Sequence, residues 1–159
     1  MKVHEVIRRG AERHAQRIAL RHGQHQITYG ELDERSDALA ETLRQHGLAS
    51  RHGVLFLPNS IEYVVAYFAV AKSDGIIAPT PISLPHERLA GEMAYCDATY
   101  AITDAAHAEA VTTAAQQVPK VRAVLTLDAA GQEAHSNVLH QSDSARSEEH
   151  TSELQSPVN

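Results

Sequence analysis

Features that would place this chain outside a reducing compartment or in a membrane are missing from the sequence. There is a single cysteine, Cys96, which excludes an internal disulfide framework. The N-terminal residues MKVHEVIRRG lack the apolar core of a signal peptide. No apolar run approaches the roughly eighteen residues that a membrane-spanning helix needs. We therefore expect a cytoplasmic protein without a membrane span.

An excess of positive charge is missing too. Fourteen Lys and Arg stand against 20 Asp and Glu, which gives a formal net charge of −6 with neutral histidines. This balance argues against a dedicated nucleic-acid surface. The apolar and charged fractions, 43% and 21%, are those of an ordinary globular protein, and 159 residues suffice for one domain with a buried core.

A strand–helix–strand pattern over residues 54–80 organises the chain. It opens on the apolar run VLFL (54–57), which is typical of a strand buried on both faces. Asn59 is expected to cap the helix that follows, and Asp74-Gly75 to end it, with the glycine in the left-handed conformation. The run IIA (76–78) then predicts a second strand. Such a short crossover requires the two strands to be parallel. The helix is expected to bury Ile61, Val64, Val65 and Phe68.

The segments on either side extend the alternation of helices and strands. Before the crossover we expect a short helix that buries Val3, Val6, Ile7 and Ala11. Two strands are expected next, at 18–20 and 26–29, joined by a glycine turn. A helix over 31–46 then begins with a Thr28–Glu31 capping box. After it we expect a helix over 86–94, a strand at 100–103, a helix capped by Asp104 that runs to Val118, and a strand at 121–127. This order predicts an α/β fold, doubly wound around a mostly parallel sheet.

The pattern changes near the C-terminus. We expect residues 1–128 to form the folded part, and residues 129–145 to be a polar segment without clear periodicity. Residues 146–159 contain RSEEHTSELQS, which resembles the translation of a sequencing-adapter oligonucleotide. We interpret these residues as a non-native tail, and expect the natural protein to continue beyond this point.

Four segments, in this order and with fitting gaps, resemble the N-terminal part of AMP-forming acyl-adenylating enzymes. They are ITYGEL (27–32), VLFLPNS (54–60), AVAKSDG followed by IIAP (69–79), and LPHERL (84–89) with the later strand AITD (101–104). The family includes acyl- and aryl-CoA synthetases, nonribosomal-peptide adenylation domains and luciferases. The resemblance covers residues 3–128 and implies the truncated N-terminal part of an AMP-binding, acyl-CoA synthetase-like domain.

The resemblance implies a two-step ligase reaction for a full-length parent: a carboxylic acid reacts with Mg-ATP to give an acyl-adenylate, which then passes to a thiol. The parent would use ATP, Mg²⁺ and either CoA or phosphopantetheine, the latter on a carrier protein. In the family the phosphate-binding loop, rich in Ser, Thr and Gly, follows the segments matched here. This sequence contains no such loop, so we assign no catalytic, cofactor-binding or metal-binding residue and expect the chain as given to be inactive.

Other candidate sites have simpler explanations. His22 and His25 flank a glycine turn and are expected to be solvated there; His46 and His52 bracket a loop. Cys96 is interpreted as a small packed side chain rather than a nucleophile. The arginines of the first helix are expected to form a solvated face, although they could meet phosphate. These arginines are Arg8, Arg9, Arg13 and Arg17.

Two other function classes stay open at this point. One is a complete small α/β module that binds a protein partner or a nucleotide without catalysis. The other is a dinucleotide-dependent reductase, which is disfavoured because no G-x-G-x-x-G opens any helix of this sequence.

Overall fold

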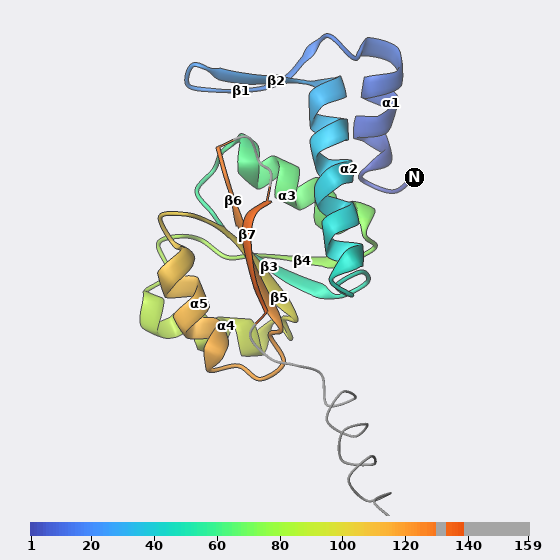
Figure 1. Cartoon of the computed structure of the whole chain (residues 1–159). Coiled ribbons are helices and arrows are strands. Elements are labelled where there is room, and N and C mark those ends of the chain that lie inside the picture. The colour runs from blue at the N-terminus through green and yellow to red at the C-terminus, as the bar shows by residue number, and fades with distance from the viewer. Residues whose placement is uncertain (130–132, 139–159) are drawn as a thin grey trace, which may run out of the picture.

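The fold is built on a five-stranded sheet with the strand order β4-β3-β5-β6-β7 (Figure 1). The structure is a computed structural model that describes residues 1–129 and 133–138. The strands of the sheet are β3 (His52–Phe56), β4 (Ile76–Pro79), β5 (Tyr100–Asp104), β6 (Ala123–Leu127) and β7 (Glu133–Val138). The first four are parallel to one another, and β7 is antiparallel to β6.

The order in which successive strands are added to the sheet reverses at β3. The chain leaves β3 for β4 on one side and returns to β5 on the other, so that Val54 lies between Ala78 and Ala101. The connections that leave the carboxyl ends of β3 and β5 therefore diverge. In doubly wound sheets such a switch point is where ligands bind.

Helices cover both faces of the sheet (Figure 1). One face packs against the layer that contains α2 (Tyr29–Gln45) and α3 (Ile61–Lys72), through Leu55, Tyr100, Ile102 and Leu125. The other packs against α4 (Leu89–Tyr95) and α5 (Ala108–Gln116), through Val54, Phe56, Ala101 and Val124. Alternate residues of β3 thus enter opposite cores, which explains why its sequence is apolar at every position from Val54 onward.

The N-terminal elements lie outside this sandwich. Helix α1 (Glu5–His14) packs beside α2, and the strands β1 (Ile18–His22) and β2 (His25–Thr28) form a separate antiparallel hairpin (Figure 1). The hairpin turns through two residues after the His22–His25 pair, and Gly23 supplies the positive φ of 60° that such a turn requires.

A cluster of ion pairs joins α1, α2 and α3. The Nζ of Lys72 lies 2.6 Å from Asp33 Oδ1 and 2.7 Å from Asp37 Oδ1, and the Lys72 side chain is only 4% exposed. It also donates to the Asp33 carbonyl at 3.0 Å. Arg8 reaches the same pair of aspartates from α1, with its Nη2 2.9 Å from Asp37 Oδ1. Two cations and two carboxylates therefore neutralise one another where three helices meet.

Several predictions are confirmed. The crossover strands are parallel, and the fold is an α/β sheet with four parallel strands. The capping box is complete: Glu31 N donates to Thr28 Oγ1 at 3.2 Å, and Thr28 N donates to Glu31 Oε2 at 2.9 Å. Helix α2 begins at Tyr29, two residues before the predicted start, and its predicted inner residues Leu32, Leu39, Ala40 and Leu43 are buried.

Both ends of α3 differ from the prediction. Ser60, not Asn59, is the N-cap, because its Oγ accepts the hydrogen bond of Tyr63 N at 3.1 Å. At the other end Asp74, not Gly75, has the positive φ, at 57°. Gly75 is needed for a different reason: a Cβ there would lie 2.7 Å from the Arg51 carbonyl oxygen.

Other expectations are also wrong in detail. Val3 lies before α1, which begins at Glu5, and Val6 lies beside the narrow stripe of α1 in which Ile7 is buried, so each valine is 49% exposed. Asp104 ends β5 and does not cap α5, which begins at Ala108 after His107. The predicted helix over 86–94 opens with a short 3-10 turn (His86–Arg88). Residues 133–138 form strand β7, although residues 129–145 show no clear pattern. The predicted tail, residues 146–159, lies outside the described residues.

Candidate functional site

A cavity of about 310 Å³ lies at the carboxyl ends of β3, β5 and β6, beside the switch point of the sheet. Three connections that are far apart in sequence meet here. They contribute Leu57, Pro58, Ser60 and Glu62 after β3; Asp104, Ala105 and Ala106 after β5; and Leu127, Asp128 and Ala129 after β6. We refer to this hollow as the carboxyl-edge cavity.

The β3 side of the cavity is shaped by the start of α3. Pro58 ends the strand connection because it has no N–H to offer a neighbouring strand. Ser60 then holds the turn, since its Oγ donates to the Pro58 carbonyl at 3.0 Å while it accepts from Tyr63 N. This places Glu62, in the first turn of α3, on the rim, where its carboxylate complements the helix dipole.

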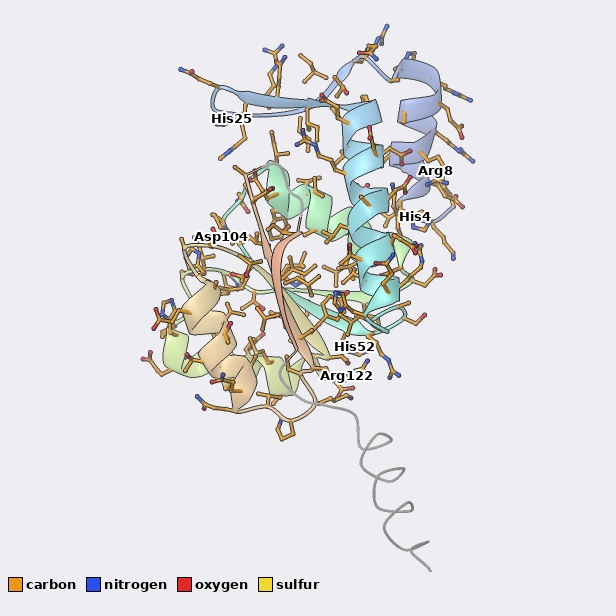
Figure 2. The ribbon with its side chains drawn as sticks, in the orientation of Figure 1. His4, Arg8, His25, His52, Asp104 and Arg122 are labelled. Atoms are coloured by element: carbon orange, nitrogen blue, oxygen red, sulfur yellow. The ribbon has the colours of Figure 1, made fainter. Side chains whose placement is uncertain are left out.

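The β5 side is held by a buried hydroxyl and a carboxylate. Thr103 Oγ1 donates to the Phe56 carbonyl at 2.8 Å and so ties the ends of β3 and β5 together. Asp104, labelled in Figure 2, ends β5. Its Oδ1 lies 2.6 Å from His107 Nδ1 and accepts from His107 N at 3.0 Å, which fixes the turn into α5. The His107 ring stands edge-on to Phe56, with their centroids 5.5 Å apart.

The side chains that line the cavity are mostly apolar, and carboxyl groups lie at its rim. Leucine, proline and alanine side chains form most of the lining, and the ionisable groups are the carboxyls of Glu62, Asp104 and Asp128. Among the described residues, no lysine or arginine lines the cavity. A nucleoside triphosphate needs cations or a cradle of N–H donors for its phosphates. The described lining therefore offers no cation that could pair with the phosphates of a nucleoside triphosphate.

A second cavity of about 380 Å³ adjoins the first, since both are lined by Glu62 and Ala129. The hairpin forms its other wall through His22, His25 and Gln26, and Arg35 of α2 also lines it. The two histidines are paired across the two-residue turn, and Figure 2 shows His25 on the hairpin. The expectation that they are simply solvated stays a prediction, but the structure places them at a cavity.

The remaining candidate histidines and the cysteine are not brought to these cavities. His46 is the C-cap residue of α2, and the Nδ1 of His52 lies 3.0 Å from the Cys96 carbonyl oxygen. The Cys96 thiol lies 3.5 Å from Glu92 Oε1. Partial burial and that carboxylate both raise the pKa of the thiol, which keeps it protonated and a poor nucleophile. Among residues 1–129 and 133–138, no group of three or more His, Cys, Asp or Glu is arranged to hold a metal ion.

The candidate arginines separate into two groups. Arg8 is engaged with Asp33 and Asp37, whereas Arg9, Arg13 and Arg17 are exposed. None of them lies at the carboxyl-edge cavity. Sequence reasoning did not find that cavity, because only the strand order brings its three connections together. The spacing of apolar residues in the predicted helix likewise does not show that Lys72 is buried.

The strand order and the cavity at the switch point define a doubly wound α/β domain of the ligand-binding type. The profile of the family described as AMP-binding enzyme matches residues 7–158, and the chain belongs to that family. The match extends to residue 158 and so includes most of the segment 146–159, whose non-native origin stays a prediction. No helix in the part of the chain that the structure describes could span a membrane.

Curated relatives include two tyrocidine synthases of Brevibacillus parabrevis. The chain is 30% identical to tyrocidine synthase 2 over 124 residues, which is 77% of this chain and 4% of the relative. It is 34% identical to tyrocidine synthase 3 over 94 residues, which is 58% of this chain and 1% of the relative. The chain thus spans a very small part of the curated relatives it matches.

Solved structures agree on the fold. The N-terminal subdomain of NpsA from Klebsiella oxytoca is 25% identical and superposes with a TM-score of 0.60 over 64% of this chain and 27% of its own. Coronafacic acid ligase from Pectobacterium brasiliense superposes with a TM-score of 0.75 at 16% identity, over 80% of this chain and 26% of its own. The chain therefore corresponds to about a quarter of these two proteins.

Proposed function

We propose that this chain belongs to the N-terminal portion of the AMP-binding domain of an ATP-dependent, AMP-forming ligase that activates a carboxylic acid as its adenylate and then forms a thioester. The observation that carries the proposal is membership of the AMP-binding enzyme family over nearly the whole chain. The proteins that this chain is similar to include both tyrocidine synthases and acid–CoA ligases. The proposed reaction therefore starts from a small carboxylic or amino acid.

The proposed chemistry has two balanced steps. A carboxylate oxygen of the acid attacks the α-phosphorus of ATP, the bond to the β-phosphate breaks, and pyrophosphate leaves. A thiol sulfur then attacks the acyl carbon, and AMP leaves. The thiol would be that of CoA or of phosphopantetheine on a carrier protein, Mg²⁺ would accompany the nucleotide, and the reaction would take place in the cytoplasm.

Within that enzyme, the described residues would supply a scaffold and one wall of the ligand cleft. The carboxyl-edge cavity supports this role, because its position at the switch point is where doubly wound domains bind ligands. Its acidic rim has no partner for phosphate charge, so the cations that hold the nucleotide would come from another part of the protein. We assign no catalytic residue to this chain.

The test is acid-dependent exchange of labelled pyrophosphate into ATP. The protein translated from the uninterrupted source gene should catalyse exchange with at least one member of a panel of amino, aryl and fatty acids. The 159-residue chain, assayed beside it, should show none with any acid.

The same assay distinguishes the proposed ligase from a binding module without catalysis. If the gene product fails to exchange pyrophosphate with every acid, and AMP-forming thioester synthesis is also absent with CoA, the ligase proposal is wrong. A folded 159-residue chain that binds a nucleotide without turnover would then favour the binding module.

A further inference from the structure

The inner face of the hairpin carries two histidines. Residues that pair directly across an antiparallel ladder project from the same face of the two strands. Leu20 pairs with Ile27, and His22 pairs with His25 two residues further along β1. Because Ile27 is fully buried, this face is the one turned towards the core. The two imidazoles therefore project from the inner face, at the exposed end of the hairpin.

Both histidines line the cavity of about 380 Å³ that adjoins the carboxyl-edge cavity. We refer to it as the hairpin cavity. Its other polar groups come from two helices: Arg35 of α2 supplies a guanidinium, and Glu62 of α3 supplies a carboxylate. The hairpin and two helices thus place ionisable side chains around one enclosed space.

The charge of the hairpin cavity depends on pH. While the imidazoles are neutral, Arg35 and Glu62 balance each other, and protonation of both imidazoles makes the lining cationic. Histidine side chains as a class gain their proton between about pH 8 and pH 5. His22, His25 and Glu62 have no ion pair or side-chain hydrogen bond within the described residues. Asp128, which follows β6, lines only the adjoining carboxyl-edge cavity. The hairpin cavity therefore gains positive charge in weak acid.

An anion fits this cavity better than a metal ion. The guanidinium of Arg35 repels cations, and no group of three or more His, Cys, Asp or Glu in the described part of the chain is arranged to hold a metal. A phosphate monoester offers three oxygens to donors that approach from the hairpin and from α2, whereas a carboxylate offers two. Ile61 and Ala129 give the cavity an apolar wall, against which an organic substituent can pack.

We propose that the hairpin cavity binds a phosphate monoester with a small apolar substituent, whose phosphate is held by His22, His25 and Arg35. The carboxylate of Glu62 opposes the phosphate and limits the affinity, most strongly while the imidazoles are neutral. Mg-ATP does not fit this site, because Mg²⁺ already neutralises much of its phosphate charge and protonated imidazoles repel the metal.

The experiment is a calorimetric titration of phenyl phosphate into the 159-residue chain at pH 6 and at pH 8. Binding should be saturable at pH 6 and about tenfold weaker at pH 8, where imidazoles are neutral while the phosphate keeps its charge. Benzoate, which joins the same ring to a carboxylate, should bind about tenfold more weakly than phenyl phosphate at pH 6. An affinity that does not change with pH, or equal binding of benzoate, would overturn the proposal.

Three variants assign the binding to this cavity. H25Q removes one imidazole, and should weaken binding at pH 6 about tenfold and reduce its pH dependence. The matched control H14Q changes an exposed histidine of α1 that also has no side-chain partner within the described residues, and should bind as the parent does. Both should unfold at the parent's urea concentration. E62Q removes the opposing carboxylate and should strengthen binding. Equal losses in H25Q and H14Q would contradict the proposal, as would weaker binding by E62Q.

Discussion

The sheet and the N-terminal layer of this molecule are held together in different ways. In β3, β5 and β6 nearly every side chain is buried, and the strands are covered by helices on both faces. In the N-terminal layer, α1 buries only Ile7 and the hairpin only Ile27, while ion pairs join α1 to α2. The first region is thus packed on both faces, whereas the second has few buried side chains and is joined to α2 partly by ion pairs.

The largest effect is expected where the sheet packs most tightly. A Cβ on Gly53 of β3 would lie 2.5 Å from the ring of Tyr100, which is fully buried. The substitution Gly53→Ala should lower the free energy of unfolding by ~3 kcal/mol, because the ring has no free space to move into. Urea unfolding followed by circular dichroism measures this change.

Gly91 provides the matched control. It lies in α4, and a Cβ there would meet no atom within 4 Å. Gly91→Ala should leave stability unchanged or raise it by up to ~1 kcal/mol, because alanine favours the helix. If both substitutions changed the free energy of unfolding equally, tight packing would not be what stabilises the sheet.

The second effect concerns the ion cluster between α1, α2 and α3. Lys72→Ala removes the amine that lies within 2.7 Å of Asp33 and Asp37, and leaves both carboxylates near each other. Since the amine is almost fully buried, we expect a loss of ~2–3 kcal/mol in the free energy of unfolding, measured by urea denaturation. The exposed Lys2–Asp74 pair tests the contrast, because Lys2→Ala should leave the urea midpoint almost unchanged.

A smaller effect is expected where the hairpin enters α2. Thr28→Ala removes the hydroxyl that accepts the hydrogen bond of Glu31 N, and should cost ~1 kcal/mol of stability in the same urea experiment. Thr28→Ser keeps the hydroxyl and should restore most of that loss. A serine variant as unstable as the alanine variant would show that the methyl group, not the cap, is what matters.

The smallest effect is a pH dependence at the same cap. The backbone N–H of Thr28, with lesser contributions from its side chain and from Arg35, lowers the pKa of the Glu31 carboxyl in the folded state. A lowered folded pKa adds stability above the unfolded value of about 4.3, and this stability is lost as the pH falls through the folded pKa. Glu31→Gln, which keeps an acceptor oxygen but no charge, should therefore unfold at lower urea than the parent at neutral pH and converge with it in acid.

The sequence predicts the sheet well where burial is continuous. Apolar runs located β3, β4, β5 and β6 to within two residues, and the Thr28–Glu31 spacing located the start of α2. Strand β7 was missed because EAHSNV offers no apolar face, and only its pairing with β6 makes it a strand. Val6 was wrongly expected to be buried, because helical spacing shows which residues align but not how wide the contact with a neighbouring helix is. Val3 was wrongly placed in a helix that begins only at Glu5.

Most of the candidate site could not be predicted from the sequence. The carboxyl-edge cavity depends on the order β3-β5-β6, which brings together Ser60, Asp104 and Asp128 from connections more than twenty residues apart. Leu57, Pro58 and Ser60 belong to the segment VLFLPNS and Asp104 to AITD, but neither segment shows that the two connections meet. The family resemblance, by contrast, rested on short local segments such as ITYGEL and VLFLPNS, and the family is confirmed.

We propose that this chain supplies part of the fold and one wall of the ligand cleft of an AMP-forming enzyme, but not the groups that hold the nucleotide. Calorimetric titration of Mg-ATP tests it most directly, with the 159-residue chain and the protein from the uninterrupted gene measured side by side. We predict saturable binding to the longer protein and no detectable heat with the chain. Tight, saturable binding of Mg-ATP to the 159-residue chain would contradict the account.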